Sequence, residues 1–174
     1  AVFTYCPLAI RFSATRDQRL THCDITKITL PGTIRRIGTG AFVEMNSLRE
    51  IAIPEGVEEI GEGAFYKCAS LKHITVPGTV KKIGKHAFLR CRKLERVYVC
   101  DGVSEIGDRA FLDCSALKTA RIPQSVQNLR TAPDGPGGYG VFNGCKKLTV
   151  HGPKGSDVEK YCREMGILFE DSAD

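Results

Sequence analysis

The chain has 174 residues, a length that suits one hydrophobic core and is short for two domains. Its formal net charge is +5, but the basic residues are spread through the sequence and interleaved with glutamates, whereas a nucleic-acid site needs a concentrated basic patch with aromatic platforms. No run approaches the roughly 18 apolar residues that span a bilayer. We therefore expect neither nucleic-acid binding nor membrane insertion.

The first 24 residues have no regular pattern. The segments VFTY and LAIRFS, on either side of Cys6 and Pro7, predict two short strands. A shift of 23 residues aligns Val2 with Ile25, but the glycine, Ala-Phe and cysteine positions of the later segments are missing. We interpret residues 1–24 as an N-terminal cap or a degenerate repeat.

From residue 25 onward a motif recurs every 23 residues: L-x-x-[IV]-x-[ILV]-P-x-x-[VI]-x-x-I-G-x-x-A-F-x-x-C-x-x. Successive copies begin at Ile25, Leu48, Leu71, Leu94 and Leu117. Self-similarity at this period is typical of a solenoid, in which neighbouring rungs bury an apolar edge that one rung cannot bury alone. The sequence predicts about five repeat rungs over residues 25–147, within a single domain.

Each rung opens with an alternation of apolar and polar residues that a proline ends in most copies, as in a short half-buried strand. We predict one parallel strand per rung, in a right-handed stack. The predicted strands cover residues 28–30, 51–53, 74–76, 97–99 and 120–122.

The other constant positions predict a layered core. One large side chain per rung should form a single buried row of Phe42, Phe65, Phe88, Phe111 and Phe142. A glycine precedes the Ala-Phe pair at Gly61, Gly84 and Gly107. We expect turns there, with backbone dihedral angles that residues other than glycine rarely adopt.

Eight cysteines are present, and four share one rung position. Packing explains these four, so we predict reduced, buried thiols at Cys68, Cys91, Cys114 and Cys145. Cys6 with Cys23 is the one disulfide considered, as an N-terminal staple in an exported protein. Because cysteines and histidines show no metal-ligand spacing, we expect no metal and no cofactor.

The fifth rung carries eight extra residues, within the Gly- and Pro-rich stretch 130–140. This insertion is either a tolerated surface loop or a functional loop. Residues 148–174 predict a C-terminal cap, with a last strand in LTVHGP and a short strand or packed tail at 167–169. Between them an amphipathic helix should begin after Ser156, with Glu159 in a capping box, and end at Gly166.

The rung pattern, with IG, AF and C at these spacings, resembles the leucine-rich repeats of the BspA-like family, also called the Treponema pallidum type. Residues 25–147 follow it, except for Met45 in place of cysteine, Cys100 in place of proline, and the insertion. The resemblance implies an α/β leucine-rich-repeat solenoid. It also implies a cell-surface or secreted protein, commonly bacterial, that takes part in adhesion or protein binding. We expect no signal peptide within these residues, so this location rests on the resemblance.

Catalysis has little support in the sequence. The four histidines are dispersed, and no nucleophile elbow, P-loop or dinucleotide-binding glycine motif occurs. We therefore expect no enzymatic activity.

In a curved solenoid the strands line a concave face, and their outward positions form rows across the rungs. One row is Lys27, Glu50, His73, Arg96 and Thr119. The neighbouring row is Thr29, Ala52, Thr75, Tyr98 and Arg121. Tyrosine and arginine dominate binding hot spots, so the candidate ligand-binding residues are His73, Arg96, Tyr98 and Arg121. Tyr139 in the insertion is a second candidate, and an ordinary exposed strand surface is the alternative.

Together these features predict a non-enzymatic binding module. Its partner would be a host or neighbouring-cell protein or glycan that carries acidic groups, and we expect the module to be a monomer. The alternative is a structural spacer or display stalk of a larger envelope protein, with no ligand of its own.

Overall fold

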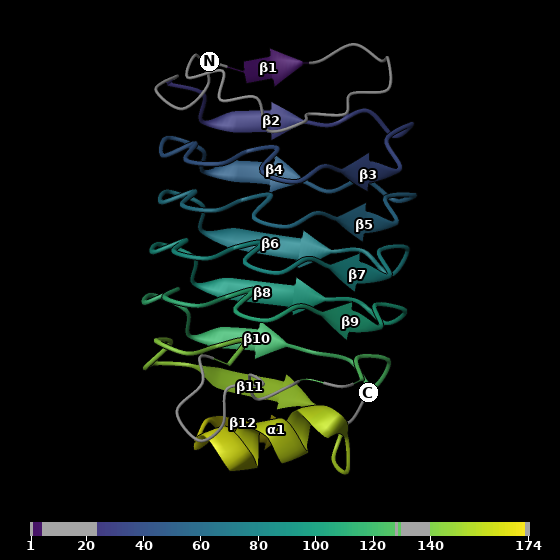
Figure 1. Cartoon of the computed structure of the whole chain (residues 1–174), viewed down its shortest axis with the longest axis vertical. Coiled ribbons are helices and arrows are strands. Elements are labelled where there is room, and N and C mark those ends of the chain that lie inside the picture. The colour runs from purple at the N-terminus through teal and green to yellow at the C-terminus, as the bar shows by residue number, and fades with distance from the viewer. Residues whose placement is uncertain (1, 5–23, 128, 130–139, 173–174) are drawn as a thin grey trace.

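The computed structural model describes residues 2–4, 24–127, 129 and 140–172, and the chain winds through them as a stack of rungs (Figure 1). Each rung places one short strand on the same side of the stack, which we call the strand face. These strands are β1 (Val2–Thr4), β2 (Lys27–Thr29), β4 (Glu50–Ala52), β6 (His73–Val76), β8 (Arg96–Val99), β10 (Thr119–Arg121), β11 (Thr149–Gly152) and β12 (Leu168–Asp171). They pair in parallel as β1-β2-β4 and as β6-β8-β10-β11-β12.

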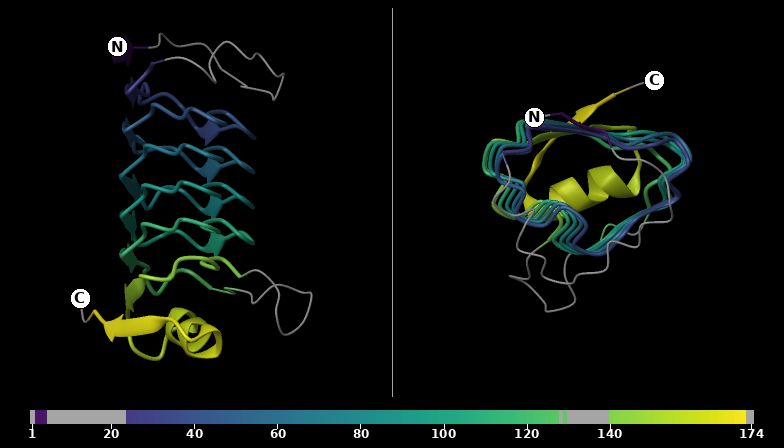
Figure 2. Two further views of the ribbon diagram at one scale, coloured as in Figure 1. Left: turned by 90° about the vertical axis from the view of Figure 1, so that its left-hand side faces the viewer. Right: turned by 90° about the horizontal axis from the view of Figure 1, so that it is seen from above.

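The five predicted strands are therefore confirmed as parallel, and each begins one residue earlier than predicted. The reason is that the polar residue before the first buried one also joins the hydrogen-bonded ladder, as when the Glu50 backbone N–H donates to the Thr26 carbonyl at 3.1 Å. The rungs stack in a nearly straight column (Figure 2), so the strand face is a flat side rather than the expected concave one.

A second parallel sheet, which the sequence reading did not predict, runs along another side of the stack. Its two-residue strands are β3 (Arg36–Ile37), β5 (Glu59–Ile60), β7 (Lys82–Ile83) and β9 (Glu105–Ile106). Their isoleucines are buried, and their charged residues form cross-rung pairs of Arg36 with Glu59 at 3.6 Å and Lys82 with Glu105 at 2.9 Å.

The predicted phenylalanine row is confirmed as the centre of the core. The rings of Phe42, Phe65, Phe88, Phe111 and Phe142 are buried and stacked, with successive centroids 5.0 to 5.4 Å apart. This separation is close to the spacing between neighbouring parallel strands, so each rung adds one ring in register. Tyr161 ends the row with an edge-on contact to Phe142 at 6.3 Å.

Glycine is required at Gly61, Gly84 and Gly107 for a reason other than the predicted one. None of the three has a positive φ. A Cβ added at any of them would lie 2.6 Å from a backbone nitrogen of the preceding rung, so the constraint is space between rungs. The left-handed backbone falls elsewhere in each rung, at residues such as Lys67 and His86.

The four repeat cysteines are free and buried, as predicted. Each thiol donates a hydrogen bond of 3.1 to 3.2 Å to the carbonyl of a phenylalanine in the preceding rung, from Cys68 to Phe42 through Cys145 to Phe111. Burial raises the pKa of Cys68 to about 12, and it raises the pKa of Cys91 and Cys114 well above 9.0. Cys6 and Cys23 lie outside the described residues.

This chemistry gives a testable contrast between thiols. Because the thiolate is the reactive form, the four buried repeat cysteines should react with a thiol reagent at neutral pH only after unfolding. Cys100 is exposed and should react at once in the native protein. Mass spectrometry after brief native labelling would check this. Rapid native modification of Cys68, Cys91, Cys114 and Cys145 would contradict it.

The C-terminal segment covers the last rung, as Figure 2 shows. Helix α1 (Asp157–Met165) begins after Ser156, whose hydroxyl accepts a hydrogen bond from the Glu159 backbone N–H at 3.3 Å, and it ends at Gly166 in the left-handed conformation. Its buried residues are Val158, Tyr161 and Cys162. The predicted capped helix and the strand that follows it are therefore confirmed.

At the other end, β1 adds a strand to the sheet. Val2 pairs with Lys27, which is not the alignment with Ile25 that a 23-residue shift predicts. The second N-terminal strand expected in LAIRFS lies outside the described residues.

Candidate functional site

The parallel register brings four of the predicted site residues together on the strand face. Tyr98 pairs with Arg121 in the next strand, and Arg96 lies two residues before Tyr98 on β8. His73 pairs with Arg96 from the preceding strand. The fifth candidate, Tyr139, lies outside the described residues.

Strand alternation sets the direction of these side chains. Val97 and Val99 point into the core, so Arg96 and Tyr98, which alternate with them along β8, point outward. Tyr98 keeps 44% of its surface exposed, which is unusual for a large aromatic side chain in this structure. An exposed tyrosine on a rigid sheet is a ready contact surface, because it offers a large face with few rotatable bonds.

Several exposed cations elsewhere on the stack are paired with a carboxylate of a neighbouring rung. The cross-rung pairs include Lys27 with Glu50 at 2.7 Å, Lys67 with Glu44 at 2.6 Å, and Arg90 with Asp113 at 3.5 Å. Such exposed pairs stabilise the fold by only about 0–1 kcal/mol each, but they leave little net charge where they occur.

Arg96 and Arg121 differ from those cations. Over the described part of the chain, neither guanidinium has a carboxylate partner or a side-chain hydrogen bond. The strand face thus presents an exposed tyrosine next to two uncompensated arginines, Arg96 along the same strand and Arg121 across on β10. Each guanidinium offers a planar set of donors that matches a carboxylate or a sulfate group.

The structure adds two features to this face that the sequence reading missed. The row of Tyr98 and Arg121 continues through His151 to Glu170, and the His151 Nδ1 lies 3.4 Å from a Glu170 carboxylate oxygen. Leu168, in β12, is 72% exposed. Ile167 and Phe169 are partly buried against the core. Because side chains alternate along a strand, the sequence Ile167-Leu168-Phe169 could have predicted that Leu168 points outward.

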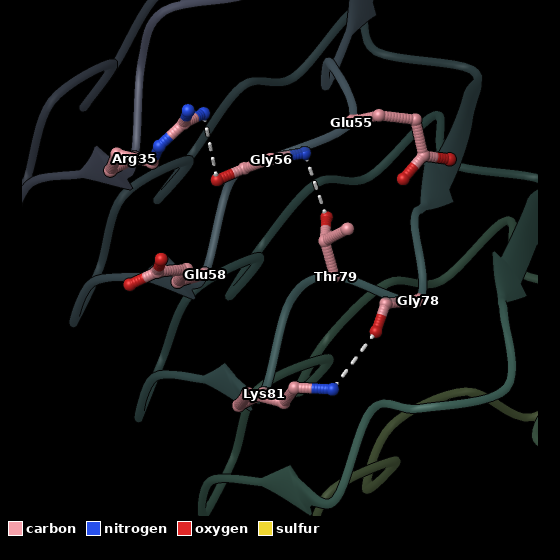
Figure 3. A pocket seen from close by; sticks show the side chains of 7 residues that line it. All are labelled: Arg35, Glu55, Gly56, Glu58, Gly78, Thr79 and Lys81. Carbon is pink, nitrogen blue, oxygen red and sulfur yellow. Dashed lines mark hydrogen bonds between the residues drawn. The ribbon is translucent and has the colours of Figure 1, made fainter.

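A shallow groove lies away from the strand face, at the turns between the two kinds of sheet (Figure 3). Its polar groups hold the turns together. Arg35 donates to the Gly56 carbonyl at 3.5 Å, the Gly56 N–H donates to the Thr79 hydroxyl at 3.1 Å, and Lys81 donates to the Gly78 carbonyl at 3.4 Å. Lys81 also donates to the Gly102 carbonyl at 3.2 Å, so these polar groups connect turns of neighbouring rungs.

The buried titratable groups have structural partners. Burial raises the pKa of Tyr161 to about 12, and its hydroxyl accepts a hydrogen bond from the Phe142 backbone N–H at 3.4 Å. Within residues 2–4, 24–127, 129 and 140–172, no three His, Cys, Asp or Glu side chains gather in a way that could hold a metal ion. The same part of the chain has no helix that is long and apolar enough to cross a bilayer.

Comparison with known proteins shows the family. A family model described as a BspA type leucine rich repeat region, in six copies, matches residues 15–149. No curated protein matches the chain.

Two solved structures are similar in sequence as well as fold. A leucine-rich repeat protein from Bacteroides ovatus is 36% identical over 73% of this chain, with a TM-score of 0.64. A leucine-rich repeat protein from Treponema pallidum is 33% identical, with a TM-score of 0.66, and the match covers 86% of this chain and 74% of that one. The match spans only 31% of the Bacteroides protein.

A third structure shares the fold alone. The pneumococcal vaccine antigen PcpA is 20% identical, with a TM-score of 0.64 over 86% of this chain and 36% of its own.

Proposed function

The chain belongs to the BspA-type leucine-rich repeat family, and from that premise we propose that it is a non-enzymatic binding module that uses its strand face. Family membership by itself indicates a binding or structural module. The observation that favours binding is the group of Tyr98, Arg96 and Arg121, since an exposed tyrosine beside two uncompensated arginines has no evident role in stacking the rungs.

The partner we propose is a protein or glycan of a host or neighbouring cell that carries acidic groups. Two arginines without carboxylate partners attract such groups, and Tyr98 offers a contact area between them. We propose that the module is a monomer at the cell surface or in the secreted fraction. Its role there would be adhesion. The family supports this placement, as does the description of one structural neighbour as a vaccine antigen.

Replacing the central tyrosine tests the proposal. Tyr98→Ala should weaken binding at least about fivefold, because truncating a hot-spot residue costs more than about 1 kcal/mol. The measurement is biolayer interferometry of the parent and variant on an array of purified extracellular-matrix proteins and acidic glycans.

Tyr66→Ala is the matched control, because Tyr66 is a partly exposed tyrosine away from the strand face that packs under Lys67. It should bind like the parent. If Tyr98→Ala and Arg121→Ala both bind like the parent, the strand face is not the site. If the parent binds no member of the array, the structural-spacer alternative replaces the proposal.

A further inference from the structure

The turns that lead into the strands carry a second concentration of charge. A two-residue turn connects the buried cysteine of a rung, or Met45 in the first rung, to the buried leucine that follows. A backbone hydrogen bond closes the turn, from the Leu94 N–H to the Cys91 carbonyl at 3.0 Å and from the Leu148 N–H to the Cys145 carbonyl at 3.2 Å. We call these the entry turns. Before β8 and β11 the entry turns are dibasic, with Arg92–Lys93 and Lys146–Lys147, and all four residues are exposed.

The other entry turns in the described repeats are uncharged. They are Asn46–Ser47, Ala69–Ser70 and Ser115–Ala116. The positive charge therefore belongs to particular rungs and is not a requirement of the turn.

Two further lysines lie beside these turns, Lys72 directly after Leu71 and Lys118 directly after Leu117, and Glu95 takes the same place after Leu94. Backbone hydrogen bonds stack this row directly, from the Glu95 N–H to the Lys72 carbonyl at 2.8 Å and from the Lys118 N–H to the Glu95 carbonyl at 3.0 Å. Glu95 itself is paired with Lys118 at 3.7 Å. Together with the dibasic turns, the row forms what we call the basic strip: Lys72, Arg92, Lys93, Lys118, Lys146 and Lys147.

The basic strip extends along the axis of the stack. Its members lie just before four successive strands of one sheet, β6, β8, β10 and β11, and neighbouring rungs are about 5 Å apart at the phenylalanine row. The entry turns form one edge of the column, on the left of Figure 1 where the strands begin. Arg96 begins β8 only three residues after Lys93, so the strip continues onto the strand face.

The composition of the strip indicates the kind of partner. Five of its six residues are lysines, which are depleted at protein–protein interfaces. Lysine acts as a mobile point charge, and a row of such charges without a pocket suits a linear polyanion, whose groups can bind in several registers. The strip contains no aromatic residue, whereas single-stranded nucleic acids are usually bound with aromatic stacking platforms.

We propose that the basic strip binds a linear sulfated glycan laid along the stack axis, with Arg96 and Arg121 extending the contact onto the strand face. The choice of a glycan over a nucleic acid rests on the proposed function, which places the module outside the cell. The glycan contact shares Arg96 and Arg121 with the proposed site but does not include Tyr98, so variants of the entry turns and of Tyr98 test the two proposals separately.

Heparin is the probe for this proposal. The test variant carries Arg92→Ser, Lys93→Ala, Lys146→Ser and Lys147→Ala, which reproduces the sequence of the neutral Ser115–Ala116 turn at both dibasic turns. The control variant carries Arg36→Gln, Lys81→Gln, Lys82→Gln and Lys85→Gln, which removes the same charge from exposed positions at or beside the second sheet.

We expect the parent to bind heparin at physiological salt and the test variant to bind at least tenfold more weakly, while the control changes less than threefold. The salt dependence of the affinity should also become shallower in the test variant, because fewer counterions are released. Hyaluronan, which lacks sulfate, should bind more weakly than heparin.

Three results would overturn the proposal. They are no heparin binding by the parent, equal losses in the test and control variants, and tighter binding of single-stranded or duplex DNA than of heparin. If any of these occurs while Tyr98→Ala still weakens binding on the array, the glycan strip is wrong and the proposed function stands.

Discussion

Phe88→Ala should lower the free energy of unfolding by about 3–5 kcal/mol. Phe88 is fully buried, and its ring stacks on Phe65 at 5.0 Å and on Phe111 at 5.1 Å. Removing the ring leaves a cavity in the middle of the row that the rungs above and below cannot close without losing their own register. In a chain of this size the melting temperature should fall by roughly 10 °C.

The position of Phe88 also predicts how the variant unfolds. In a solenoid each rung contacts mainly its neighbours, so stability is close to a sum of rung and interface terms. Weakening the central interfaces should uncouple the two halves and broaden the transition. Urea unfolding followed by circular dichroism would measure both effects. Tyr98→Ala is the control, since Tyr98 is exposed and should leave the midpoint almost unchanged. An unchanged midpoint in Phe88→Ala would contradict the central role of the row.

The sequence predicts this core well because one period governs it. The phenylalanines and cysteines recur in phase, and stacked rungs bring equal phases together, so burial follows directly from spacing. The second sheet escaped prediction because its strands are two residues long, which is too short for an alternation to be recognised. Strand β5, for example, consists of Glu59 and Ile60 alone.

The candidate site was only partly predictable. Tyr98 and Arg121 occupy the same position in successive repeats, which predicts that they lie side by side, and the structure confirms that register. Arg96 and Arg121 lack carboxylate partners in the structure. This property depends on distances between side chains, and the sequence alone does not give those distances. The basic strip is harder still to recognise, because its two dibasic turns are separated by a whole rung and by the insertion at 130–140.

The recurring glycines show how one pattern can have two physical causes. A glycine that occupies the same position in four of the five rungs is required either for a positive φ or for lack of space, and the sequence alone does not separate these causes. Gly84 illustrates the second cause. Its backbone N–H donates to the Ile60 carbonyl at 2.7 Å, and a Cβ would lie 2.6 Å from the Glu62 nitrogen and 2.6 Å from the Gly61 carbonyl carbon.

Gly84→Ala should therefore destabilise the protein by at least about 3 kcal/mol, at the upper end of overpacking costs, because the obstructing atoms are backbone and cannot rotate away. Gly32→Ala is the matched control, since a Cβ there meets nothing within 4 Å and Gly32 has no positive φ. It should be neutral or slightly stabilising, because alanine restricts the unfolded chain. Chemical denaturation of both variants measures the contrast. Equal midpoints for the two would show that the rungs can separate freely at Gly84, and that close backbone contact does not hold the stack together there.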